Sequence, residues 1–149
     1  MNQIRKPPEH QQPDADGDIG SSIIARSGRR RRDSLFPGSA VEVIVDSSIA
    51  GANLYGGTNT LRPDATIPLH WHVTSEVQYV LKGRGLLLRD QGEPLPVYEG
   101  DCVFSPAGRR ASHGFYNDGE DDLVILFFYP SDAGLRPQLR IMSDTQGAH

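Results

Sequence analysis

The chain has 149 residues, a length that suits a single domain, and it carries a formal net charge of −4. Residues 1–33 hold seven basic and five acidic side chains, whereas residues 34–149 hold eight basic and fourteen acidic ones, and this acidic body argues against a nucleic-acid-binding domain. The single cysteine, Cys102, excludes an intrachain disulfide, and the longest apolar run, Leu123–Tyr129, has seven residues where a membrane helix needs about 20.

The first part of the chain, residues 1–33, is expected to be a flexible polar and basic tail. Residues 1–22 are polar, contain Pro and Gly, and show no hydrophobic periodicity. The run RRRR at 29–32 has two interpretations: a contact with a nucleic acid, an anion or a partner, or a solvated basic segment that joins the tail to the domain. A single short cluster favours the solvated segment.

Residues 34–149 are expected to form one β-domain. Ala40–Ser47 alternates and is rich in β-branched residues, as in a strand, and Ala52–Arg62 is a second extended stretch. The segment KGRG at 82–85 predicts a hairpin between the strands on either side of it. Short strands separated by turn signals, with no amphipathic helix of twelve residues, predict an all-β sandwich or barrel. The remaining strands are expected at 76–82, 86–90, 96–99, 102–105, 112–116, 123–129 and 139–142.

Three of the five histidines lie in strand-like segments, and two of these are one residue apart. Side chains at positions i and i+2 of a strand share a face, so His70 and His72 can reach the same ion. The segment 73–75 can turn and bring Glu76 back toward them, and His113 can add a ligand from a distant strand. Three imidazoles and a carboxylate suit a divalent first-row metal and leave one or two coordination positions open. An equal alternative for the HxHx3E segment alone is that its histidines are structural.

These motifs resemble those of the cupin superfamily over about residues 40–130. Asp64 stands where the first cupin motif has its first glycine, and Asp tolerates turn and left-handed geometry. The second motif has four residues between Gly108 and His113 where the family usually has two. The first motif, G-x5-H-x-H-x3,4-E-x6-G, is matched at Asp64, His70, His72, Glu76 and Gly83, and the second, G-x5-P-x-G-x2-H-x3-N, at Gly100, Pro106, Gly108, His113 and Asn117.

The resemblance implies a cupin-type jelly roll, or conical β-barrel, with one divalent transition-metal ion inside. Iron is the first expectation, and zinc, nickel, manganese and copper are alternatives. The resemblance also implies a homodimer, with the extended segment at 34–50 as a dimer element. The implied metal ligands are His70, His72, Glu76 and His113.

Other residues near these motifs are candidates for the site. Glu76 could leave the metal and act as a catalytic base, and Gln78, two residues later on the same strand face, is either a catalytic or substrate contact or a core amide. Phe115 shares a face with His113 and either walls a substrate pocket or packs the core.

The turn before His113 offers positive charge. Arg109 and Arg110 are either a clamp for a substrate carboxylate or phosphate, or solvated loop side chains. Cys102 lies in an expected strand and is expected to be buried.

The leading functional hypothesis is a mononuclear metal enzyme acting on a small organic molecule that could be anionic. The similarity of a His3Glu site to that of cupin dioxygenases favours an Fe(II) dioxygenase. With a metal acting as a Lewis acid, the same site suits a lyase, dehydratase, isomerase or cyclase. A third hypothesis is a non-enzymatic cupin that binds a small ligand. Because the N-terminus lacks an apolar signal segment, we expect a cytoplasmic protein without membrane or nucleic-acid partners.

Overall fold

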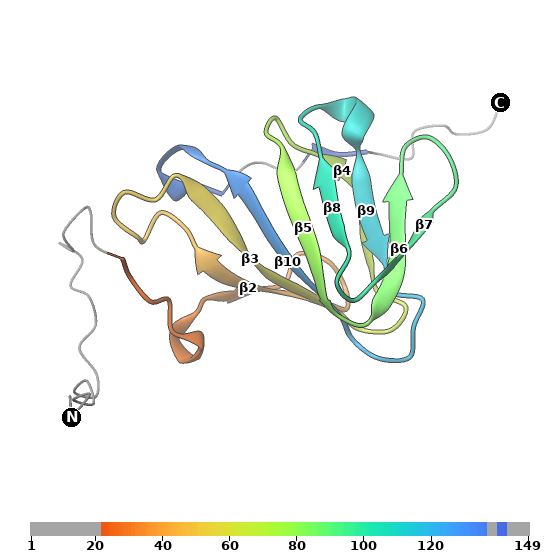
Figure 1. Ribbon diagram of the computed structural model, residues 1–149, viewed down its shortest axis with the longest axis horizontal. Coiled ribbons are helices and arrows are strands. Elements are labelled where there is room, and N and C mark those ends of the chain that lie inside the picture. Colours follow the sequence, from red (N-terminus) through yellow and green to blue (C-terminus); the bar gives the residue numbers. More distant parts are fainter. Residues whose placement is uncertain (1–21, 137–139, 143–149) are drawn as a thin grey trace, which may run out of the picture.

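The chain folds into two antiparallel β-sheets, as the sequence predicts for an all-β jelly-roll barrel (Figure 1). The structure is a computed structural model that describes residues 22–136 and 140–142. The six-stranded sheet has the order β1 (Arg32–Asp33), β2 (Ser39–Val45), β3 (Leu54–Leu61), β10 (Leu123–Pro130), β5 (Glu76–Lys82), β8 (Cys102–Ser105). The five-stranded sheet has the order β11 (Arg140–Ile141), β4 (Thr66–Trp71), β9 (His113–Tyr116), β6 (Arg84–Arg89), β7 (Leu95–Tyr98).

The helices of the described residues are single 3-10 turns. They are η1 (Ser27–Arg29), η2 (Arg109–Ala111) and η3 (Asp132–Gly134). No described helix is long and apolar enough to cross a membrane.

Alternation along the strands gives each sheet one inner face. Every second side chain of β10 from Leu123 to Tyr129 is buried, and in β5 the buried side chains begin at Glu76 and recur at every second residue to Val80. The buried apolar side chains form two clusters. One is largely aliphatic and comprises Leu61, Ala65, Ile67, Val80, Val97, Phe115, Leu123 and Ile125. The other is mostly aromatic and comprises Val41, Val43, Tyr55, Phe127 and Tyr129.

A bulge in β4 changes which residues of that strand face inward. The pairing of β4 with β9 shifts register between Ile67 and His70, and Ile67 and His70 are both buried although their positions differ by an odd number. One added residue moves all later side chains of a strand to the opposite face. The bulge therefore allows the apolar Ile67 and the two histidines, His70 and His72, to face the interior of the barrel together.

The hairpin predicted at residues 82–85 is wrong. β5 pairs with β10 and β8, whereas β6 pairs with β7 and β9 in the other sheet. Gly83 has φ of +83°, and a Cβ there would lie 2.5 Å from the carbonyl oxygen of Asp122. The chain turns at this left-handed glycine, tight against the start of β10, and crosses to the second sheet instead of folding back on β5.

The prediction that Cys102 is buried is also wrong. In β8, Ser105 and Val103 share the inner side of the strand, and Cys102 therefore lies on the outer face, where it is exposed. Its partner across the sheet, Tyr79 on β5, is exposed as well. A strand of four residues with mixed polarity gave no reliable sign of which face was inner.

The basic run at 29–32 lies along the first strands of the six-stranded sheet. Arg30 and Arg32 both form ion pairs with Glu42 of β2, at 3.0 and 3.4 Å, and Arg31 pairs with Asp33 and Asp46. Arg32, the last residue of this run, begins β1, which pairs with β2, so the sheet starts two residues before the expected boundary at residue 34. These contacts give the arginines a role within the domain, although exposed ion pairs contribute little stability. The rest of the expected tail, residues 1–21, lies outside the described residues.

Candidate metal centre

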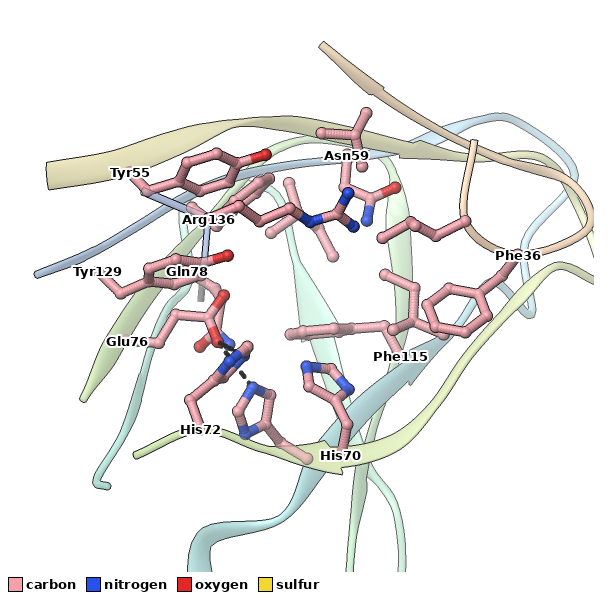
Figure 2. A pocket seen from close by; sticks show the side chains of 16 residues that line it. Phe36, Tyr55, Asn59, His70, His72, Glu76, Gln78, Phe115, Tyr129 and Arg136 are labelled. Carbon is pink, nitrogen blue, oxygen red and sulfur yellow. Dashed lines mark hydrogen bonds and ion pairs between the residues drawn. The ribbon is translucent and has the colours of Figure 1, made fainter. Parts of the chain in front are cut away.

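The four side chains expected to bind a metal are brought together inside the barrel. One ligand atom from each of His70, His72, Glu76 and His113 lies within 4.8 Å of those of the others. All four residues are buried. One carboxylate oxygen of Glu76, Oε2, lies 2.9 Å from Nε2 of His113 and 3.1 Å from Nε2 of His72 (Figure 2). Two of the imidazoles thus meet a single carboxylate oxygen.

The ligands come from both sheets. His70 lies in β4, directly across from His113 at the start of β9, and His72 follows the end of β4. Glu76 is the first residue of β5, in the other sheet. The intervening turn returns the chain across the interior, as the sequence predicts. A metal ion bound here would therefore connect the two sheets.

Backbone carbonyl groups orient two of the imidazoles. Nδ1 of His70 donates to the carbonyl oxygen of Pro68 at 2.9 Å, and Nδ1 of His113 donates to that of Ala111 at 2.9 Å. A neutral ring that donates from Nδ1 has a lone pair at Nε2. For His113 that lone pair faces the Glu76 carboxylate, an arrangement that a shared cation would make favourable. Such carbonyl contacts are common around metal-bound histidines.

His72 supplies the clearest sign that the cluster suits a metal. Both of its ring nitrogens are buried, and neither makes a hydrogen bond to the described residues. The contact of Nε2 with Glu76 is close enough for an ion pair but lacks hydrogen-bond geometry. An unpartnered buried polar group costs about 1–3 kcal/mol. Coordination of a metal by Nε2 would satisfy one of these nitrogens.

Burial and mutual contacts set the charge of the cluster. Burial lowers the pKa of His70 to about 4, with a further contribution from His113, so this ring is neutral and able to bind a metal at neutral pH. Burial acts to raise the pKa of Glu76, but the close contacts of its carboxylate with the rings of His113 and His72 outweigh it and lower the pKa to about 2. Glu76 is therefore a carboxylate over the whole physiological range. Burial raises the pKa of the nearby Tyr129 hydroxyl, which keeps its proton.

The cluster opens into a cavity that is partly open to solvent. Tyr55 and Tyr129 stack in one wall, with ring centroids 5.5 Å apart and planes 13° from parallel. Phe127 lies against both, and the ring of His72 is 5.0 Å from that of Tyr129. The aromatic wall therefore reaches directly to the metal ligands, and a mostly apolar lining with a few polar groups is typical of small-molecule sites.

The other expected site residues divide into two groups. Gln78 and Phe115 line the same cavity as the ligands, and Oε1 of Gln78 accepts a hydrogen bond from the Ser105 hydroxyl at 3.3 Å. Arg109 and Arg110 do not line it: both are exposed on η2, and Arg110 borders a separate hollow that His113 also lines.

Four residues that line the cavity with polar side-chain groups were not predicted from the sequence: Tyr55, Asn59, Tyr129 and Arg136. Asn59 belongs to β3 and shares the inner side of that strand with the buried Tyr55 and Leu61. This alternation was the one signal that could have identified Asn59. Arg136 follows the last long strand and has no motif around it.

Comparison with known proteins supports this assignment of the site. Residues 57–129 match the family model described as Cupin domain, and this segment contains all four ligands. A gentisate 1,2-dioxygenase from Ralstonia sp is 32% identical over 77 residues, which are 52% of this chain and 21% of that protein. An oxalate-binding protein from Thermotoga maritima is 36% identical over 67 residues, 44% of this chain and 53% of the relative. The matches thus span about half or less of the length of these two curated relatives.

The fold is shared over a larger part of the chain. The solved structure of the polyketide cyclase RemF from Streptomyces resistomycificus matches 85% of this chain and 89% of its own, with a TM-score of 0.71. The sequence identity is 20%, so this similarity concerns the fold.

Proposed function

Because this chain belongs to the cupin superfamily, we propose that it is a mononuclear metal enzyme acting on a small organic molecule, with an Fe(II)-dependent dioxygenase reaction as the first candidate. The observation that carries the proposal is the buried set of three histidines and a glutamate at one end of an aromatic-lined cavity. The relative named gentisate 1,2-dioxygenase supports the reaction class.

A metal ion held by His70, His72, Glu76 and His113 would supply an electrophilic centre with coordination positions left for a substrate and, with iron, for reaction with O2. The protein's own groups perform the remaining tasks. The stacked rings of Tyr55 and Tyr129 give a planar substrate a surface that keeps it against the ligands. The apolar walls exclude water from the reacting atoms, which strengthens every electrostatic contact inside.

A Lewis-acid reaction, such as that of an isomerase, lyase or cyclase, is the second candidate. It is favoured by the proton-carrying Tyr129 hydroxyl, whose ring lies against the ligand His72. A reaction that moves protons without consuming O2 would use such a donor together with the Glu76 carboxylate.

The metal assignment is tested with His72→Ala, after purification without a chelator. Metal analysis is expected to find about one ion per chain in the wild type and almost none in H72A. The matched control is Trp71→Phe: Trp71 is the neighbouring residue but lies toward the outside, where Arg140 stacks on its ring at 5.0 Å. Equal metal content in H72A and W71F would refute the assignment.

The reaction class is tested by oxygen consumption. The iron-loaded wild type and H72A are each given gentisate and related dihydroxybenzoates in an oxygen electrode, and the same mixtures are followed without O2. Consumption of O2 with product by the wild type alone supports the dioxygenase. Equal product formation without O2 would replace it by the Lewis-acid reaction.

A further inference from the structure

The cavity contains a second polar region, away from the metal ligands. Figure 2 shows Arg136 and Asn59 on one side of the cavity and His70 and His72 on the other. Apart from the amide of Gln78, the walls between the two polar regions are aromatic or aliphatic. A ligand that fills the cavity therefore meets the ligand cluster at one end and these two residues at the other.

Arg136 brings a charge that nothing in the described residues balances. It is the only residue with a permanent positive charge among those that line the cavity, and no ion pair between described residues includes it. Arg136 is exposed, as expected for a residue at the mouth, but its side chain points inward toward Asn59 (Figure 2). Its charge also reaches the interior, where it opposes the rise in the pKa of Tyr129.

A few backbone contacts hold the segment that carries Arg136 against the barrel. The backbone amide of Ser131 donates to the carbonyl oxygen of Asn53 at 2.9 Å, and within the segment the amide of Leu135 donates to the carbonyl oxygen of Asp132 at 3.1 Å. Gly134, at φ of +66°, packs so closely on the loop after β2 that a Cβ would lie 2.6 Å from the backbone of Asp46. These contacts direct the chain so that residue 136 meets the cavity.

Asn59 supplies an independent sign of a ligand. Its side-chain oxygen Oδ1 is buried and accepts no hydrogen bond within the described residues. The residue lies in the middle of β3, paired with Val41 on one side and Ile125 on the other, so its backbone is fixed and its side chain projects from the inner side of the strand. A buried acceptor without a partner is costly and is normally satisfied by water or a ligand.

We infer that Arg136 and Asn59 form the substrate-selecting subsite, and that it binds the carboxylate of a planar aromatic or conjugated acid whose other end reaches the metal ligands. One guanidinium matches one carboxylate, whereas a phosphate dianion would call for further cations that the described lining lacks. The stacked Tyr55 and Tyr129 favour a flat ligand. A hydroxyl or N–H beside the carboxylate would donate to Asn59. This inference rests on the proposed function, since it assigns the substrate class of the same site.

The test measures how much the carboxylate of a ligand contributes to its affinity, separately from the group that binds the metal. The full chain is loaded with zinc, which does not oxidise catechols, and titrated calorimetrically with catechol, 3,4-dihydroxybenzoate and 3,4-dihydroxycinnamate. All three carry the same chelating group, and only the two acids carry a remote carboxylate. At least one acid is expected to bind about tenfold more tightly than catechol, the effect of a charge-assisted hydrogen bond at a partly exposed site.

Amino-acid substitutions identify the residue that causes the preference for the acids over catechol. Arg136→Gln is expected to remove the advantage of the acid and to leave catechol affinity unchanged. Arg140→Gln removes a charge from the same part of the chain, but Arg140 stacks on Trp71 outside the cavity, so this control should bind like the wild type. The inference is overturned if neither acid outperforms catechol in the wild type, or if R136Q retains the preference.

Failure of the proposed function would appear separately, as a wild-type chain that binds no zinc. In that case the carboxylate preference is measured on the metal-free chain with cinnamate and cinnamyl alcohol, which need no metal. A preference for cinnamate that R136Q abolishes and R140Q keeps supports the subsite. Equal binding of the two compounds by the wild type overturns it.

Discussion

Gly114 lies between the ligand His113 and the cavity residue Phe115, and the structure predicts that Gly114→Ala damages both the fold and the metal site. A Cβ at position 114 would lie 2.4 Å from the carbonyl oxygen of Ile67 and 2.9 Å from the carbonyl carbon of Pro68. Ordinary contact begins at 3.4 Å, so the backbone of β4 must retreat by about 1 Å. Because the Pro68 carbonyl accepts the hydrogen bond from His70, this retreat also displaces a ligand.

The size of the effect follows from these contacts. The atoms that clash belong to the backbone of a bulge between paired strands, which cannot yield as a side-chain end would, so we expect a loss of about 1–3 kcal/mol in the free energy of unfolding. Disturbing the carbonyl that orients a metal-bound histidine is expected to weaken metal affinity about 10–100-fold.

Urea denaturation of the metal-free chain measures the first effect, and competition with a chromophoric chelator measures the second. The matched control is Gly28→Ala, since a Cβ at Gly28 would meet nothing within 4 Å. If G114A has the same denaturation midpoint and the same metal affinity as G28A, the proposed coupling of the bulge to the site is wrong.

Two further predictions concern stability. Removal of the metal with a chelator is expected to lower the melting temperature by about 5–10 °C, since a ligand at 100 times its Kd stabilises by about 2.7 kcal/mol, and a thermal scan of H72A should show no such decrease. A decrease of the same size in H72A would mean that the chelator acts elsewhere. Asn117→Ala is expected to cost about 2–4 kcal/mol, because the fully buried Asn117 amide donates to Leu61 and Asp121 and accepts from Gly119. Urea midpoints check this against Asn53→Ala at an exposed position, and an equal loss in both variants would refute it.

The residues of the candidate metal centre could be predicted because their signal is local. His70, His72 and Glu76 are close in sequence, and the strand period together with the motif spacing relates them to one point. The departures from the cupin motifs also have local structural explanations. Asp64 adopts φ of +65°, the conformation for which a glycine would be favoured. The two added residues before His113 are taken up by η2, while the amide of Gly108 donates to the His72 carbonyl at 2.8 Å.

The remaining features depend on residues far apart in the chain. The bulge in β4 exists because of its pairing with β9, and the crossing at Gly83 depends on the approach of the start of β10. Asn59 and Arg136 meet only because β3 and the segment after η3 border the same cavity. Neither residue belongs to a motif, and hydrophobic periodicity contains no information about which polar groups converge. The expected homodimer stays a prediction.

The metal ligands and Arg136 are held in the fold in different ways, and this difference affects how such a chain can evolve. Each metal ligand is held in or beside paired strands, so almost any change near it also disturbs the barrel. Arg136 lies beyond the long strands, on a segment attached through a few backbone contacts. Substitutions there can change which acid is accepted while the chemistry at the other end stays intact. Directed evolution toward new substrates would therefore begin with libraries at positions 135 and 136, where substitutions are expected to disturb the barrel little.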